Sequence, residues 1–232
     1  FGLFLSYFCP AEGRLNFDVT SVPFYSGPLG GAGPPRLEGA TLMIIRGLSA
    51  VAAAAILTAF AGQAQGAVTV IGGGLAEACS QAAIRGLSDR RLEELCDMAL
   101  ETEPMNARDR AGTYVNRGVL RMRREEYGRA VADFNQAVKI RPELGEGYVN
   151  RGAAYIGQRR YAESLPEINR GLELGVEEPA KAYYNRALAH EGLEDARSAY
   201  FDYRKALELA PEWALPTEQL ARFTVTTRTP SN

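Results

Sequence analysis

The hydrophobic pattern in the second half of the chain indicates paired helices. Within residues 127–140, Ala130, Phe134 and Ala137 are spaced three or four residues apart, which places them on one helix face. The same columns of small and large residues return twice, as Ser164, Ile168 and Gly171 and as Ala199, Tyr203 and Ala206. Small residues let two helices approach closely while large residues fill the groove between them, so each unit predicts a tightly packed helix pair.

A polar motif precedes each of these helices. Residues 114–118 read Tyr-Val-Asn-Arg-Gly, residues 148–152 repeat this motif, and residues 183–187 read Tyr-Tyr-Asn-Arg-Ala. The three asparagines are separated by 34 and 35 residues. A period of this length is typical of a solenoid of stacked helical units, because no single unit can bury its own apolar face. Such an architecture favours binding over catalysis.

Taken together, the columns resemble the tetratricopeptide repeat, a helix-turn-helix unit of 34 residues. The matching residues are Gly118, Ala130, Phe134, Ala137 and Pro142, then Gly152, Tyr155, Tyr161 and Leu172, then Ala187, Ala199, Tyr203, Ala206 and Pro211. The resemblance implies an all-α fold, a right-handed superhelical solenoid of stacked antiparallel helix pairs. Its repeats are expected at residues 111–144, 145–179 and 180–213.

Several positions depart from the family pattern, and the second repeat departs most. Gly171 stands where the family prefers Ala, and Val176 where it prefers Pro. Because Gly in a helix costs about 1 kcal/mol relative to Ala, we expect the second repeat to be the loosest. In all three repeats the motif arginine, at positions 117, 151 and 186, replaces a residue that is often Leu in the family.

Residues 68–110 are expected to form a degenerate helical hairpin that caps the amino-terminal end of the stack. We predict helices at 77–85 and 89–101, with Gly86 ending the first and Ser88 capping the second. Terminal repeats are often atypical because one of their faces has no neighbour.

Cys79 and Cys96 lie almost symmetrically about the turn of this hairpin. Residues equidistant from the turn of an antiparallel helix pair lie side by side, which suits a disulfide. Two ordinary buried thiols, or a redox-active pair, are the alternatives.

At the other end, residues 214–223 are expected to form a short capping helix that packs Leu220 and Phe223 on the third repeat. Residues 224–232 are expected to be a free tail.

The first part of the chain has a different composition. Residues 1–42 are rich in Pro and Gly and begin with Phe, so we interpret them as an unstructured or mistranslated extension, with a genuine flexible tail as the alternative. Residues 43–67 have the order of a secretory signal: a charge, an apolar run, and then small residues such as Ala59-Phe60-Ala61. The mature chain would then start between residues 62 and 68.

The predicted signal leads us to expect an exported protein, most simply in the bacterial periplasm. The apolar run is shorter than the ~20 residues that a membrane span needs, so no stable span should remain after cleavage. The alternative is a protein anchored by an uncleaved segment at 44–61. The even number of cysteines after cleavage fits an oxidising compartment.

Charge and candidate chemistry narrow the function further. A net charge of −2 argues against a nucleic-acid partner. The single histidine, His190, excludes multi-histidine metal sites, and the glycine run at 70–77 lacks both the third glycine and the βαβ unit of a dinucleotide site. The basic residues at 121–129 are balanced by neighbouring acids. We therefore expect neither an enzyme nor a cofactor or metal site.

The resemblance implies a concave groove lined by the first helix of each repeat. The predicted peptide-binding residues are Val115, Asn116, Val119, Met122, Val149, Asn150, Ile156, Lys181, Tyr184, Asn185 and Leu188. An Asn carboxamide both donates and accepts a hydrogen bond, so it can satisfy the amide and carbonyl of an extended peptide. The alternative is that the Asn-Arg pairs only bond neighbouring helices.

These observations predict an exported adaptor or scaffold that binds an extended segment of another protein. The alternatives are a self-associating repeat protein of the cell envelope, which leaves a homo-oligomer open, and a non-catalytic subunit of an envelope enzyme complex. The identity of the partner does not follow from the residues.

Overall fold

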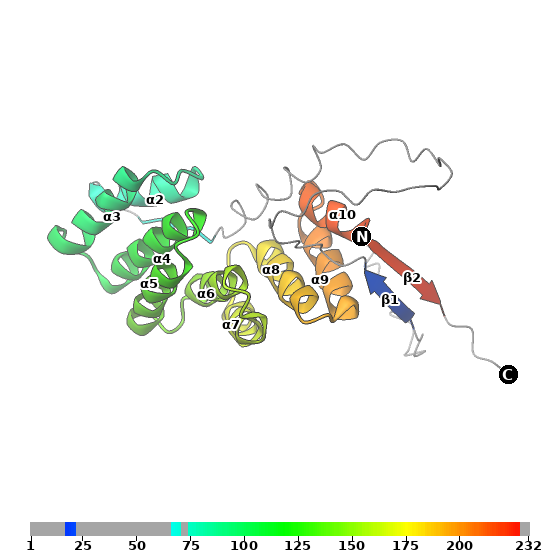
Figure 1. The fold of residues 1–232 in the computed structure, drawn as a ribbon. Helices are drawn as coiled ribbons and strands as arrows, with labels where there is room; N and C mark the ends of the chain where they lie inside the picture. Colours follow the sequence, from blue (N-terminus) through cyan, green and yellow to red (C-terminus); the bar gives the residue numbers. More distant parts are fainter. Residues whose placement is uncertain (1–16, 22–65, 71–73, 228–232) are drawn as a thin grey trace, which may run out of the picture.

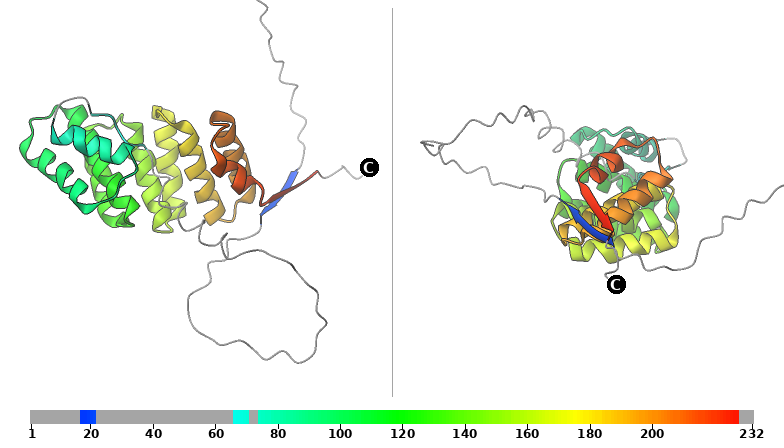
Figure 2. Two further views of the ribbon diagram at one scale, coloured as in Figure 1. Left: turned by 90° about the horizontal axis from the view of Figure 1, so that it is seen from above. Right: turned by 90° about the vertical axis from the view of Figure 1, so that its right-hand side faces the viewer.

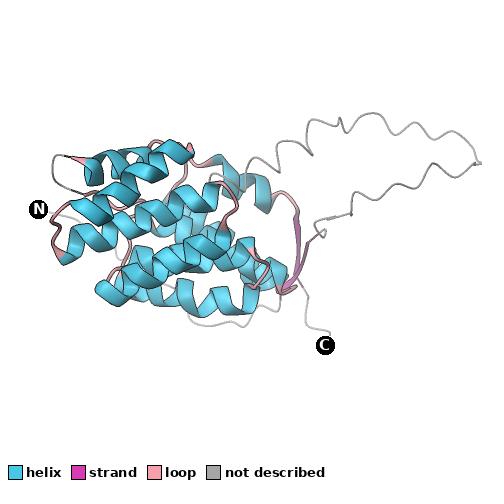
Figure 3. Cartoon of the chain, turned by 60° about the vertical axis from the view of Figure 1, so that its left-hand side comes forward, coloured by secondary structure: helices cyan, strands magenta, loops and turns pink. Residues whose placement is uncertain are grey.

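The computed structural model describes residues 17–21, 66–70 and 74–227, and within them the fold is a row of stacked helix pairs (Figure 1). Successive helices run antiparallel, and each pair lies against the next along the row (Figure 3). The pairs are α2 (Leu75–Ile84) with α3 (Arg90–Thr102), α4 (Ala107–Arg123) with α5 (Tyr127–Ile140), α6 (Gly145–Gly157) with α7 (Tyr161–Leu174), and α8 (Pro179–Gly192) with α9 (Ala196–Leu209). The predicted helical solenoid is confirmed.

The last helix and the amino-terminal hairpin differ in detail from the prediction. Helix α10 (Ala214–Leu220) stops three residues early, but Leu220 and Phe223 still pack on the core of the third repeat. Asp89, and not Ser88, caps α3, because its side chain accepts a hydrogen bond from the backbone N–H of Arg91. Gly86 ends the first helix as predicted, with a φ of 76° that favours glycine.

Glycines in the repeats make room for the facing helix. A Cβ at Gly118 would lie 2.5 Å from the Phe134 ring, and one at Gly152 would lie 2.6 Å from Ile168. Both large residues are fully buried. The small and large columns therefore meet as the sequence predicted, with the first helix of each repeat seated against the second.

Gly171 has the same role between the two helices of the second repeat, where Gly145 faces it. A Cβ at Gly171 would lie 2.4 Å from Val149 Cγ2 and 2.8 Å from the backbone oxygen of Gly145. The departure from the family's Ala therefore permits close backbone contact between α6 and α7. Glycine at position 171 lowers helix propensity, but it also lets the two helices pack closely, and the two effects on stability oppose each other.

We expect Gly171→Ala to lower the free energy of unfolding by about 1–3 kcal/mol, since the overpacked Cβ outweighs the gain in helix propensity. Urea denaturation measures the change. Gly128→Ala is the matched control, because only the tip of Gln158 lies within 4.0 Å of its added Cβ. A Gly171→Ala variant more stable than the wild type would show that α6 and α7 are not in this close contact.

The motif arginines join the helices into a continuous ladder. Arg117, Arg151 and Arg186 each donate to an acid sixteen residues later on the second helix of their own repeat, at Asp133, Glu167 and Asp202. Each also reaches the second helix of the preceding pair, at Asp97, Asn135 and Asn169. The arginine half of the motif therefore bonds neighbouring helices, which was one of the two expected roles of the Asn-Arg pair.

The motif tyrosines hold these arginines in place. The guanidinium carbons of Arg117, Arg151 and Arg186 lie 5.3, 5.2 and 5.0 Å from the ring centres of the tyrosines three residues earlier. Stacking on a ring fixes the planar guanidinium without removing its hydrogen-bond donors. The motif thus assigns Tyr and Arg to repeat stacking and Gly to helix contact.

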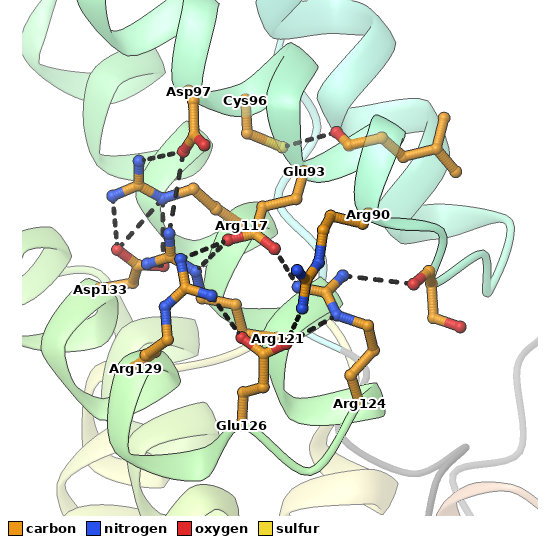
Figure 4. A network of polar contacts seen from close by, with 12 residues as sticks. Arg90, Glu93, Cys96, Asp97, Arg117, Arg121, Arg124, Glu126, Arg129 and Asp133 are labelled. Atoms are coloured by element: carbon orange, nitrogen blue, oxygen red, sulfur yellow. Dashed lines mark hydrogen bonds and ion pairs between the residues drawn. The ribbon is translucent and has the colours of Figure 1, made fainter.

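A network of ion pairs joins the amino-terminal hairpin to the first repeat (Figure 4). Glu93 of α3 is buried and accepts hydrogen bonds from Arg121, Arg124 and Arg129. Asp133 of α5 accepts from Arg117 and Arg121. Burial raises the pKa of the Asp133 carboxyl, although both neighbouring arginines oppose that shift.

In the same hairpin, Cys79 of α2 faces Cys96 of α3 in a geometry that suits a disulfide, with a Cα–Cα distance of 5.0 Å. Both residues are fully buried in the core cluster that also holds Val115 and Phe134. The facing positions of the two cysteines agree with the predicted antiparallel pair.

Two predicted loop regions contain strands instead. Strand β1 (Phe17–Ser21) pairs antiparallel with β2 (Phe223–Thr227), with Val19 opposite Val225, at the carboxyl-terminal end of the stack (Figure 2). The predictions of an unstructured 1–42 and a free 224–232 are wrong for these residues. The prolines and glycines that suggested disorder lie outside residues 17–21, where β-branched and aromatic residues favour a strand.

The predicted signal lies mostly outside the described residues, which resume at Gly66. In the described part of the chain, no helix has both the length and the hydrophobicity to cross a membrane.

Candidate functional site: the asparagine column

The motif asparagines form a column along the first helices of the repeats, with Asn116 on α4, Asn150 on α6 and Asn185 on α8. Their side chains are buried, with exposed fractions of 0%, 0% and 4%. Beside this asparagine column lies an extended stretch of the same chain, residues 66–70, which we call the groove segment. From the sequence we expected the signal to end at residue 67 and the amino-terminal cap to begin at residue 68, and neither expectation placed this stretch beside the asparagines.

Asn116 binds the backbone of the groove segment with both the oxygen and the nitrogen of its carboxamide. Its Oδ1 accepts from the N–H of Val68 at 2.8 Å, and its Nδ2 donates to the carbonyl oxygen of Val68 at 2.8 Å. Ser80 of α2 donates to the same carbonyl at 2.9 Å and accepts from the N–H of Val70 at 3.4 Å. These contacts recognise a backbone and not a side chain, as a carboxamide can do for any extended peptide.

The next asparagine continues this arrangement. Asn150 Nδ2 donates to the carbonyl oxygen of Gly66 at 3.0 Å, while its buried Oδ1 has no hydrogen-bond partner among the described residues. Two residues of the groove segment therefore correspond to one repeat of the solenoid. The groove segment runs from α6 toward α2, opposite to the order of the repeats.

Apolar contacts hold the side chains of the groove segment. Val68 packs against the core cluster that contains Val115 and Val119, and Val70 is 5% exposed beside Ala76 and Ala99. Gly112 of α4 leaves space for both valines, because a Cβ there would lie 2.9 Å from Val68 Cγ1 and 3.3 Å from Val70 Cγ2. Thr69, between the two valines, is exposed, as the alternation of an extended strand requires.

A small hollow lies where the groove segment begins, between α6 and α8. Carboxylates and one lysine line it beside Val149 and Asn185. Its remaining lining residues are Gly66, Ala67, Glu146, Val176, Glu177, Glu178 and Lys181. Lys181 forms an ion pair with Glu178, and Glu146 accepts from the N–H of Glu177. The third asparagine thus borders open space, whereas the first two contact the groove segment.

The other predicted groove residues divide into two groups. Val115, Val119 and Met122 are buried in the cluster against which Ala67 and Val68 pack. Ile156, Tyr184 and Leu188 belong to the core of the second and third repeats, where the Tyr184 ring packs on Tyr203 and Trp213. For Tyr184 the prediction of an open groove position is wrong, because Trp213 at the start of the carboxyl-terminal cap packs on its ring.

The candidate chemical groups are all used in structural contacts. Glu103 binds the first turn of α2, accepting from the N–H groups of Leu75 and Ala76, where a phosphate would have to bind. Residues 71–73 of the glycine run lie outside the described residues. His190 lies 3.5 Å from Asp195 and 3.8 Å from Asp202. In the described part of the chain, no cluster of His, Cys, Asp and Glu could hold a metal ion.

The basic cluster around the turn between α4 and α5 likewise makes its contacts within the chain. Arg123 donates to the carbonyl oxygens of Ala83 and Leu87 at the end of α2, and burial lowers its pKa. Arg121, Arg124 and Arg129 bind Glu93, as described above, so this cluster is not an anion site.

Comparison with known proteins identifies the repeats. The tetratricopeptide repeat model matches residues 111–144 and 180–212, which are the first and third of the predicted repeats. The second repeat, α6 with α7, lies outside these two ranges, and it carries the departures at Gly171 and Val176. No curated protein matches the chain.

Two solved structures, both of MamA, agree on the fold. MamA 41-end from Desulfovibrio magneticus RS-1 is 22% identical, with coverage of 64% of this chain and 82% of that one and a TM-score of 0.50. Another crystal structure of MamA is 17% identical, with coverages of 65% and 82% and a TM-score of 0.51. The first TPR domain of Spaghetti (RPAP3), bound to an HSP90 peptide, is 24% identical, with coverages of 48% and 87% and a TM-score of 0.45.

Two sets of residues around the site escaped the sequence analysis. The acids that pair with the motif arginines recur sixteen residues after each arginine, and this spacing could have revealed them. The groove segment had a weaker signal, the alternation of Val68, Thr69 and Val70. The residues of α2 give no signal that the Ser80 hydroxyl bonds the backbone of the groove segment.

Proposed function

We propose that this chain is a protein-interaction module that binds an extended peptide segment of a partner protein along the asparagine column. The observation that carries this proposal is the pairing of Asn116 with both backbone groups of Val68. Such pairing makes affinity depend on the backbone, while adjacent apolar pockets select side chains. The partner's role is to supply a strand, and the module performs no chemistry.

The adaptor is further proposed to act after export, in the bacterial periplasm, with anchoring through an uncleaved 44–61 as the alternative. The order of charge, apolar run and small residues in 43–67 supports export. The facing positions of Cys79 and Cys96 suit an oxidising compartment. Intact mass and terminal sequencing of the purified protein test the proposal, which expects a first residue between 62 and 68. A chain that retains residue 43 contradicts cleavage.

Partner capture tests the binding function. We expect Asn150→Ala combined with Asn185→Ala to reduce crosslinked partner in the native envelope by about tenfold or more, as loss of one to two backbone hydrogen bonds per site implies. The thermal melt should change little, because among the described residues these two side chains make one hydrogen bond, from Asn150 to Gly66.

Gln136→Ala is the matched control, since Gln136 is an exposed carboxamide on α5. It should leave capture at the wild-type level. Lost folding with intact capture in the double variant would contradict the proposal and assign the asparagines to packing alone.

A further inference from the structure

The groove segment is a ligand of the asparagine column that belongs to the chain itself. Three groove side chains, Ser80, Asn116 and Asn150, satisfy four of its backbone groups. No described hydrogen bond reaches a side chain of residues 66–70. Its affinity for the groove therefore comes from the extended backbone and from two apolar side chains.

The geometry points to the chemistry of the partner. Resting on the function proposed above, we propose that the partner's segment is extended and carries β-branched aliphatic residues at two alternate positions. We propose further that it binds by replacing the chain's own groove segment. Two groove residues set these requirements. Gly112 leaves room for two valine side chains, and Asn116 pairs with the N–H and the carbonyl of one ligand residue.

Asn150 makes only one hydrogen bond to the groove segment, and a partner's segment could supply the second. The Oδ1 of Asn150 is buried and unpartnered among the described residues, although the same atom of Asn116 accepts an N–H. A buried acceptor without a partner is unfavourable, so a ligand that places a backbone N–H against this oxygen gains over the groove segment.

Replacement predicts competition inside one molecule. A tethered segment acts at an effective concentration in the millimolar range, so it raises the apparent dissociation constant of any ligand for the same groove. Weakening the groove segment should therefore increase the affinity for an added peptide. This increase distinguishes replacement from binding at a separate surface.

The test uses the full chain and a fluorescent peptide with the sequence Gln-Gly-Ala-Val-Thr-Val-Ile-Gly, taken from residues 65–72. Val68→Asp places a charge against the apolar cluster and should release the groove segment. We expect this variant to bind the peptide at least about tenfold tighter than the wild type. Thr69→Asp is the matched control, because Thr69 is exposed, and it should bind like the wild type.

The outcomes separate the claims. Equal affinity of the wild type and a folded Val68→Asp chain would overturn replacement. Equal binding of a peptide with Asp at both valine positions would overturn the side-chain preference while leaving peptide binding intact. Failure of the folded Val68→Asp chain to bind either peptide would contradict the proposed function as well. A wild-type mass that doubles with concentration would assign the groove to a second copy and overturn the proposal.

If Val68→Asp does not fold, hydrogen exchange on the wild-type chain gives the same decision. Saturating peptide should speed exchange at the chain's own Val68 amide, because Asn116 then binds the peptide instead. An unchanged exchange rate at saturation would overturn replacement.

Discussion

Glu93→Gln is expected to lower the free energy of unfolding by about 3 kcal/mol, one of the two largest effects that the structure predicts. The Glu93 side chain is 4% exposed and accepts from three arginines, and two of these, Arg121 and Arg124, are 9% and 17% exposed. Gln has nearly the same volume but no charge. The substitution therefore removes the buried charge that faces Arg121 and Arg124, which keep their other acids, Asp133 and Glu126. Chemical denaturation measures the loss.

Glu94→Gln is the matched control for this substitution. Glu94 precedes the turn of α3 that carries Asp97 and is exposed, so its charge contributes little. The control should change stability by less than about 0.5 kcal/mol. Equal stability of the two variants would contradict the account in which Glu93 ties the amino-terminal hairpin to the first repeat.

The second large effect concerns the hairpin's crosslink. Replacing both Cys79 and Cys96 with Ser should cost about 3 kcal/mol, the chain-entropy estimate for a loop of this size. The predicted bond would close a sequence separation of 17 residues within the pair of helices that caps the stack. Thermal unfolding under oxidising conditions measures the difference.

Reductant provides the control for the crosslink. It should lower the melting temperature of the wild type and leave the Cys79→Ser, Cys96→Ser variant unchanged. The oxidised wild type should also weigh less than the reduced chain by two hydrogen atoms. Two thiols that react with an alkylating reagent before reduction would contradict the crosslink.

The repeat architecture was predictable because it depends on residue size at fixed spacing. Gly118 opposite Phe134 and Gly152 opposite Ile168 are local consequences of two columns that the sequence displays directly. The cap was predictable in outline for the same reason. The point where the carboxyl-terminal cap gives way to a strand was not predictable, because β2 depends on pairing with β1, which lies about two hundred residues earlier in the chain.

The site was predictable only in part, and the reason is the distance between its components. The period of the motif identified the asparagine column, and the resemblance to the family predicted that this column faces a groove. The occupant of that groove was missed, because Val68 reaches Asn116 from 48 residues away and its neighbours in sequence resemble a linker. Tyr184 was misplaced because the sequence does not show that Trp213 packs over it.

The role of the motif arginine came from the structure. The sequence showed that the motif arginine departs from the family pattern, but it did not show which acids the arginine binds. In the structure Arg117 binds Asp133 and Asp97, and this arrangement recurs in each repeat. The neighbouring asparagine is thereby left to face the groove, because adjacent residues on a helix point in different directions.

Amide hydrogen exchange along the groove segment tests the central claim that the asparagine column holds an extended backbone. The N–H of Val68 donates to Asn116 Oδ1, whereas the N–H of Thr69 donates to no described residue. We predict that the Val68 amide exchanges at least about tenfold more slowly than the Thr69 amide, and that Asn116→Ala removes the difference. Exchange of both amides at the rate of an unstructured chain would contradict the account.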